Sequence, residues 1–209
     1  MPISAKRALP WIACLAVSSS LACGSEQQPD SPAAPVGEAA TRSSSAIGGA
    51  DASVVAEFNA RIQDYMSLHQ QLAGTLTPLA KEPTPREIDV HQRALLALIA
   101  KARQGNAPGN MFSPEMQTFV RGLLGQVFDG PEGKRLRSSI EDENPVGIVI
   151  ALNGRYPDSV PLSTMPPDVL RALPALPPEL EYRFVGNRLV LVDTVARLIV
   201  DIVDNALPG

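Results

Sequence analysis

The hydrophobic pattern of this 209-residue chain changes once, near Pro145, and this change limits the folds that are open to it. Before Pro145, apolar residues recur every three or four positions, which is the period of helices buried along one face. After it, β-branched residues dominate, as is typical of strands. We therefore predict an α+β domain, with an N-terminal antiparallel bundle of about four helices over residues 51–143 and a small antiparallel β-sheet over residues 146–206.

Two long helices joined by a short connection are predicted in the first half of the domain. The first begins at Asp51 and ends at Pro78. Its buried stripe consists of Val55, Phe58, Ile62, Tyr65, His69, Leu72 and Leu76. The second begins with Thr84 and Glu87, whose spacing is that of a capping box, and it ends at Gly105. Because the connection is short, the two helices should be antiparallel neighbours.

Two shorter helices are predicted to follow. Ser113-Pro114-Glu115 supplies an N-cap residue, a proline for the first turn and an acid near the positive end of the helix dipole. A fourth helix follows Pro131. It should end before Glu141-Asp142-Glu143, because acidic residues at a helix C-terminus oppose the dipole.

The clearest strand prediction is a hairpin over residues 181–193. Gly186-Asn187 fits a two-residue turn between two alternating apolar segments. The resulting register pairs Phe184 with Leu189 and Tyr182 with Leu191. Turn chemistry and hydrophobic alternation therefore select the same register, and the face that carries these four residues belongs to the core.

Three further segments complete the predicted strand half. Residues 146–152 are rich in β-branched side chains and end at Asn153-Gly154, which is a hairpin turn signal. Residues 157–178 are rich in proline and are predicted to wrap across the domain surface, with one short helical turn over residues 166–173. Residues 194–206 fit either a helix or a third strand, and the density of β-branched residues favours the strand. On a strand, its inward residues are Leu198, Val200 and Ile202.

The first 23 residues have the order of a bacterial export signal. Lys6-Arg7 precedes an apolar run over residues 8–22, and small residues stand at positions −3 and −1 before Cys23. The run is shorter than the ~20 residues that cross a bilayer. Ser20-Leu21-Ala22-Cys23 also resembles a lipobox, in which the cysteine receives a diacylglycerol, although its leucine is at −2 rather than −3. Both processing routes predict that residues 1–22 are removed, and the lipobox predicts lipidation of Cys23.

Residues 23–50 are predicted to be a disordered tether. They are rich in Ser, Pro, Ala and Gly and contain almost no large apolar side chain, so they bury too little surface to offset the cost of ordering. Gly24, in place of an aspartate after the cysteine, resembles lipoproteins that are sorted to the outer membrane. We therefore expect an exported protein of the bacterial cell envelope, anchored to the outer membrane through a lipid on Cys23 and facing the periplasm.

Several segments of the mature domain resemble a family of uncharacterised exported bacterial proteins. The resemblance rests on residues 180–186, 189–193 and 198–201, together with Tyr156-Pro157 and Pro166-Pro167. It covers most of the mature domain, but its motifs are structural. Because the family has no assigned activity, the resemblance supports the domain boundaries and implies no catalytic residue.

Net charge and cysteine content limit the partners that the protein can bind and the ways in which its fold can be stabilised. Cleavage removes two of 18 basic residues and none of 22 acidic ones, so the mature chain carries a net charge of −6. An acidic chain without a basic patch argues against nucleic acid as a partner. Cys23 is the only cysteine of the mature chain, which excludes an intrachain disulfide and leaves stability to a core of Leu, Ile and Val.

One constellation offers metal ligands. His69 and His91 lie at similar heights of the predicted helical hairpin, and Glu87 lies one turn before His91. Two imidazoles and a carboxylate suit zinc. The preferred interpretation is structural: His69 is a core residue bonded to a neighbour such as Tyr65, and His91 and Glu87 are surface residues. A pH-sensitive contact is a third possibility, and no cofactor is predicted.

Three acids flank the predicted strands and offer a second kind of chemistry. Asp193, Asp201 and Asp204 include candidates for a carboxylate pair in acid–base catalysis, although turn and edge roles are commoner for such residues. The sequence contains no nucleophile elbow and no complete phosphate loop. We therefore expect a non-enzymatic, envelope-tethered domain that binds or supports another cell-envelope component, protein or ligand. The alternatives are a hydrolase that uses these acids and a metal-binding module that uses the histidine pair.

Overall fold

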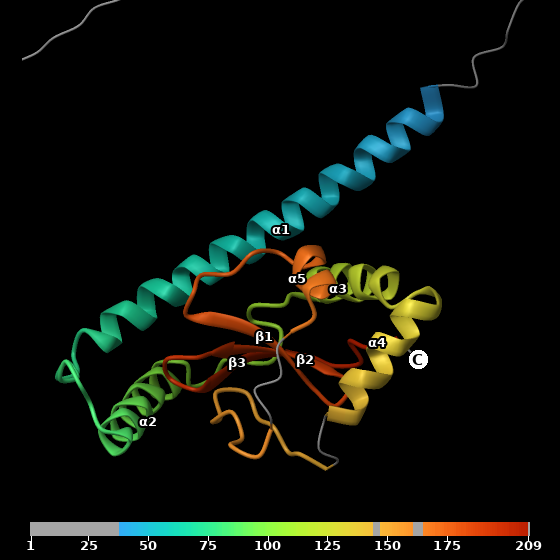
Figure 1. The fold of residues 1–209 in the computed structure, drawn as a ribbon. Helices are drawn as coiled ribbons and strands as arrows, with labels where there is room; N and C mark the ends of the chain where they lie inside the picture. The colour runs from blue at the N-terminus through green and yellow to red at the C-terminus, as the bar shows by residue number, and fades with distance from the viewer. Residues whose placement is uncertain (1–37, 144–146, 161–164, 209) are drawn as a thin grey trace, which may run out of the picture.

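The computed structural model describes residues 38–143, 147–160 and 165–208. The helices are α1 (Glu38–Ala73), α2 (Pro85–Ala102), α3 (Pro114–Val127), α4 (Gly130–Glu143) and α5 (Pro167–Ala172), and the strands are β1 (Leu180–Val185), β2 (Arg188–Asp193) and β3 (Leu198–Val203). Because the helices precede a three-stranded antiparallel sheet, the predicted α+β class is confirmed (Figure 1). The predicted signal peptide, Cys23, residues 24–37 of the tether and residues 144–146 lie outside the described residues.

Two helices begin where their capping residues predict. The Glu87 backbone N–H donates to the Thr84 hydroxyl, and the Thr84 backbone N–H donates to the Glu87 carboxylate at 2.7 Å, which completes the capping box of α2. The Ser113 hydroxyl accepts a hydrogen bond from the backbone N–H of Met116 at the start of α3. The short helix α5 also occupies its predicted place within the proline-rich segment.

Two helix ends differ from the prediction. α1 begins at Glu38 rather than at Asp51, so residues 38–50 are helical where the sequence predicts a tether. The chain has no proline between Pro35 and Pro78, and a formed helix extends at low cost because each added residue gains a hydrogen bond without new nucleation. α4 continues through the acidic run to Glu143, where Arg137 on the preceding turn pairs with Glu141 at 2.8 Å. The N-terminal part of α1 projects away from the rest of the domain (Figure 1).

The sheet has the order β1-β2-β3, and its first hairpin has the predicted register. Phe184 lies opposite Leu189, and Tyr182 lies opposite Leu191. Gly186 in the turn has a φ of 60°, a conformation that glycine adopts without strain. The chain after β2 forms a strand, so the predicted third strand is confirmed.

β3 contains a bulge at Val200 that the sequence did not predict. Leu191 lies opposite Asp201 and Val192 lies opposite Ile199, so Val200 has no opposing residue on β2. An extra residue of this kind reverses the alternation of faces along a strand. Asp201 therefore shares a face with Leu191, and Ile202 packs with Ile199 on the other face. The prediction that Ile202 shares a face with Leu198 and Val200 is wrong for this reason.

The sheet is buried on both faces. On one face, residues of all three strands pack with residues of the helices in the main core, which includes Leu95, Ile99, Leu189, Leu191 and Leu198. On the other face, a smaller core consists of Tyr156, Val160, Val185, Val190, Val192 and Ile199. Among the described residues, no helix combines the length and the apolar character that a membrane span needs.

The predicted strand over residues 146–152 is not observed in its described part, residues 147–152. Ile148 and Ile150 instead pack against the smaller core, and Val149 between them is 86% exposed. Pairing with β3 begins only afterwards, where the Asn153 N–H donates to the carbonyl of Ile199 at 2.9 Å. The β-branched residues of this segment are thus explained by burial of alternate side chains, which needs no strand partner.

Candidate functional site

Asp193, at the end of β2, is the centre of a buried polar cluster. Its carboxylate is fully buried, and Oδ2 lies 2.6 Å from both the Tyr65 hydroxyl and Nδ1 of His69. The other oxygen, Oδ1, accepts a hydrogen bond from the backbone N–H of Ala196 at 2.8 Å. Tyr65 and His69 are one turn apart on α1, so they reach the same carboxylate. Asp193 therefore joins α1 to the sheet.

The electrostatics of this cluster favour a cationic histidine beside a neutral tyrosine. The hydrogen bond to Asp193 raises the pKa of His69, the charge of Glu179 acts in the same direction, and burial opposes both. Burial raises the pKa of Tyr65 far above its usual range, and the neighbouring Asp193 carboxylate raises it further. The tyrosine hydroxyl thus stays a donor, and the protonated form of His69 supplies a counter-charge for the buried carboxylate.

A second buried polar cluster surrounds Arg103, which directly follows α2 and is only 3% exposed. Its Nε donates to Oδ1 of Asn153 at 2.8 Å, and its Nη2 donates to the carbonyl of Val200 at 2.7 Å. The guanidinium also lies 5.2 Å from the centroid of the Tyr65 ring, within the range of a cation–π contact. Arg103 therefore donates a hydrogen bond to the carbonyl of the bulged residue and, through its contact with Tyr65, links the bulge to α1.

Sequence reasoning did not single out Arg103. A basic residue at a helix C-terminus usually complements the dipole and stays solvated, so its position gave no signal of burial. The only local sequence signal near Arg103 is Gly105, which has a φ of 93°. It indicates where the helix ends, but not that Arg103 is buried. The acceptors of Arg103 lie 50 and 97 residues away in the chain, beyond the reach of local patterns.

The three predicted acids have three different roles. Asp201 is fully buried and accepts hydrogen bonds from the backbone N–H groups of Gly109, Met111 and Phe112 at 3.0, 2.7 and 2.9 Å. These bonds hold the loop between α2 and α3 against β3. Asp193 holds α1, as described above. Asp204 is exposed and pairs with Arg188 at 3.0 Å. The carboxylate oxygens of Asp193 and Asp201 are therefore occupied by structural hydrogen bonds.

The structure does not bring His69, His91 and Glu87 together as a metal site. His69 is hydrogen-bonded to Asp193, and Glu87 is hydrogen-bonded within the capping box of α2. His91 is half-buried on α2. In the part of the chain that the structure describes, no three His, Cys, Asp or Glu side chains are placed to hold a metal ion together. The hydrogen-bond partner of His69 is Asp193 rather than the predicted Tyr65, because both α1 side chains point to the same carboxylate.

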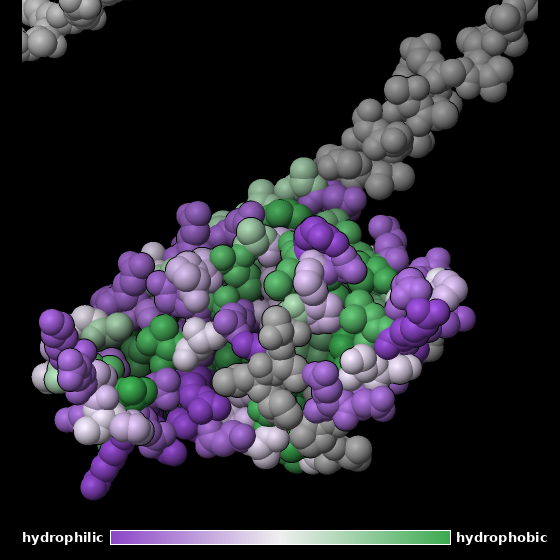
Figure 2. All heavy atoms as spheres, viewed as in Figure 1, coloured by the Kyte–Doolittle hydropathy of each residue, from purple (hydrophilic) through white to green (hydrophobic). Residues whose placement is uncertain are grey.

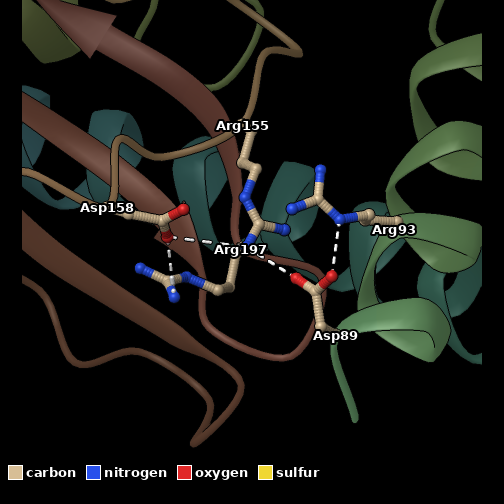
Figure 3. Close-up of polar contacts among 5 residues, drawn as sticks. All are labelled: Asp89, Arg93, Arg155, Asp158 and Arg197. Carbon is tan, nitrogen blue, oxygen red and sulfur yellow. Dashed lines mark hydrogen bonds and ion pairs between the residues drawn. The ribbon is translucent and has the colours of Figure 1, made fainter. Parts of the chain in front are cut away.

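A chain of alternating charges lies where α2 meets the sheet, as Figure 3 shows. It consists of Arg93, Asp89, Arg155, Asp158 and Arg197. Asp89 pairs with Arg93 at 2.7 Å and with Arg155 at 3.0 Å, while Asp158 lies 3.5 Å from Arg155 and 3.0 Å from Arg197. The chain connects α2 to the turn between β2 and β3. Solvent screens most of these pairs, so their main effect is on the relative placement of these elements.

A groove with a volume of about 600 Å³ runs beside β1. One wall is the proline-rich segment 174–178, and the other is the first part of β1. The Tyr182 hydroxyl donates to the carbonyl of Pro174 at 3.1 Å, which fixes the two walls relative to each other. Met165 and Leu170 of α5 also line the groove, and Leu170 is 48% exposed. Figure 2 shows apolar side chains at the surface in this region, between α1 and α5.

Comparison with known proteins identifies no relative of this chain. No family model, no curated protein and no solved structure matches the chain. The resemblance to exported bacterial proteins therefore stays a prediction from sequence. What the protein does has to be inferred from its own residues.

Proposed function

We propose that the protein is a non-enzymatic binding domain of the bacterial cell envelope, which holds an extended apolar segment of a partner protein in the groove beside β1. The groove is the observation that carries this proposal. Its volume of about 600 Å³ is within the range of ~300–1,000 Å³ that is typical of binding pockets. The walls are mostly apolar, and the hydrogen bond from Tyr182 holds them in place without a ligand.

The chemistry of the groove favours apolar contact over backbone pairing. Pro174, Pro177 and Pro178 carry no backbone N–H, so this wall offers few donors to an added chain. Leu170 and Leu176 present aliphatic surface instead. Glu181 and Arg183 pair with each other at the opposite wall. A partner segment with leucine-like side chains fits these walls better than a polar one.

The roles of the strand acids support a non-enzymatic function. Acid–base catalysis needs a carboxylate that can exchange protons with a substrate. Asp193 and Asp201 are fully buried, and each already accepts hydrogen bonds on both oxygens. Their removal should therefore affect folding before it affects any reaction.

The groove is tested by site-specific photo-crosslinking in intact envelopes. A photoreactive side chain at position 170, on the groove, should capture one recurrent partner. The same group at position 149 is a matched control, because Val149 is exposed and lies outside the groove. Equal capture at both positions, or none at position 170, would contradict the proposed binding site.

Membrane anchoring through Cys23 is part of the proposal and has its own test. It is supported by the lipobox-like Ser20-Leu21-Ala22-Cys23, and the N-terminal end of α1 projects from the domain, so an upstream anchor leaves the groove accessible (Figure 1). Cys23→Ser should move the protein from the membrane fraction to the soluble fraction of the periplasm. Cys14→Ser, the matched control within the signal peptide, should leave it in the membrane fraction. An unchanged distribution of Cys23→Ser would exclude the lipid anchor.

A further inference from the structure

A second hollow, of about 510 Å³, lies between α1 and the loop that joins α2 to α3. It shares no lining residue with the groove beside β1. Its polar lining consists of Arg61, Asp64, Tyr65, Arg103, Asn106 and Asn110. Two arginines against one aspartate give these walls a positive balance, in contrast to the acidic chain as a whole. The hollow therefore differs from the groove in both place and chemistry.

Arg103 is the unusual member of this lining because its charge is buried without an ion pair. The residue is 3% exposed, and both of its hydrogen-bond acceptors, Asn153 and the Val200 carbonyl, are neutral. Within the described residues, no carboxylate forms a salt bridge with it. Buried charges in proteins are usually paired. Asp201 attracts the guanidinium from nearby, but its oxygens are bonded to backbone N–H groups.

The guanidinium of Arg103, which lines the hollow, also keeps unused hydrogen-bonding capacity. Nε and Nη2 are used by the protein, and Nη1 has no partner among the described residues. Burial lowers the pKa of Arg103, as expected for a cation that lacks a close counter-charge. The stacked Tyr65 ring and the bond to Asn153 fix the plane of the guanidinium. A positioned arginine of this kind is suited to carboxylate and phosphate groups.

Two charged side chains at the hollow affect the charge of a ligand that it can bind. Arg61 donates to the carbonyl of Asn110 at 3.2 Å, which places its guanidinium beside the loop, and its ion pair with Glu57 offsets part of its charge. Asp64 is exposed on the same helix and repels an anion. Asp64 is exposed and Arg61 is half-buried outside the core, so each charge can be removed without opening the core.

We propose that this hollow is a binding site for an anionic group, a carboxylate or a phosphate, which pairs with Nη1 of Arg103 and is attracted by Arg61. The ligand supplies a directly paired counter-charge, whereas the protein supplies only the nearby charge of Asp201. The site is independent of the groove beside β1, so either can exist without the other.

The experiment is an NMR titration of the purified protein with sodium phosphate and, separately, with sodium acetate, each against sodium chloride at equal ionic strength. Saturable shifts of the backbone N–H signals of Asn106, Gly109 and Asn110 are expected with at least one of the two anions. Saturation by phosphate alone assigns a phosphate ligand, and saturation by acetate assigns a carboxylate. Shifts no larger than those caused by chloride would overturn the proposal.

Three variants separate a site from general surface charge. Asp64→Asn should tighten binding about twofold to fivefold, and Arg61→Gln should weaken it by a similar factor, because one exposed charge changes an interaction by at most about 1 kcal/mol. Arg93→Gln, in the charge chain outside the hollow, should change nothing. An equal loss in Arg93→Gln and Arg61→Gln would overturn the proposal, as would unchanged binding in Asp64→Asn. None of these variants depends on replacement of Arg103, whose loss would disturb the bulge.

Discussion

Replacement of His69 by glutamine should destabilise the domain and flatten the dependence of its stability on pH. The substitution removes the imidazole, a cation when protonated, whose Nδ1 lies 2.6 Å from the buried carboxylate of Asp193. Loss of one partner of a buried ion pair costs about 3–5 kcal/mol. Asp193 keeps its hydrogen bonds from Tyr65 and from the Ala196 N–H, and glutamine is itself a donor, so a loss of about 2–4 kcal/mol is expected.

The direction of the pH effect follows from the raised pKa of His69 in the folded domain. In the unfolded chain the group titrates near its ordinary value of 6.5. A raised folded-state pKa contributes stability that is fully present below that ordinary value and is lost as the pH rises through the folded pKa. The wild type should therefore lose free energy of unfolding as the pH rises above about 6.5, and His69→Gln should show less of this loss.

Urea denaturation and thermal melting, each measured over a series of pH values, test this expectation. A loss of 2–4 kcal/mol corresponds to a fall in melting temperature of roughly 5–15 °C for a domain of this size. His91→Gln is the matched control, because His91 is the only other histidine of the chain and is only half-buried on α2. If the two variants are equally stable, or if His69→Gln keeps the full pH dependence of the wild type, the assigned role of the Asp193 cluster is wrong.

Substitutions at two further positions test the placement of loops and helix ends. Asp201→Asn should lower the free energy of unfolding by about 1–3 kcal/mol, because one of the two carboxylate oxygens that accept backbone N–H groups is replaced by a donor; hydrogen exchange should increase first at Met111 and Phe112, and unchanged exchange there would contradict this role. Thr84→Ala should cost about 1 kcal/mol in urea denaturation, through loss of the N-cap of α2, whereas Thr84→Ser should retain most of that stability.

Features with a local cause were predictable from the sequence. The hairpin register followed from Gly186-Asn187 and from alternation, both within a dozen residues, and the starts of α2 and α3 followed from capping residues within one turn. In each case the side chains that determine the structure are neighbours in the chain. Tertiary contacts then had only to agree with the local preference.

Features that depend on distant partners were not predictable in this way. The bulge at Val200 leaves a carbonyl that Arg103 occupies from 97 residues away, and Asp193 is 124 residues from His69. The segment 147–152 contains three consecutive β-branched residues, as a strand often does, but in the structure Ile148 and Ile150 cover the second face of the sheet without pairing. Periodicity reports which side chains are buried, and it does not identify the element that buries them.

The candidate site shows the same difference between features with a local cause and features that depend on distant partners. His69 was recognised as a core residue from its place on the apolar stripe of α1, while its partner came from the opposite end of the domain. Neither the groove nor the hollow at Arg103 has a local sequence signal. Each is built from at least two segments that only the fold brings together.

The most direct test of the proposed function is the affinity of the partner captured at position 170 for two purified variants. Leu170→Glu places a charge on the apolar groove and should weaken binding at least tenfold, whereas Val149→Glu, on a surface outside the groove, should bind as the wild type does. Equal affinity of Leu170→Glu and the wild type would show that the partner does not occupy the groove, and the central claim would then fail.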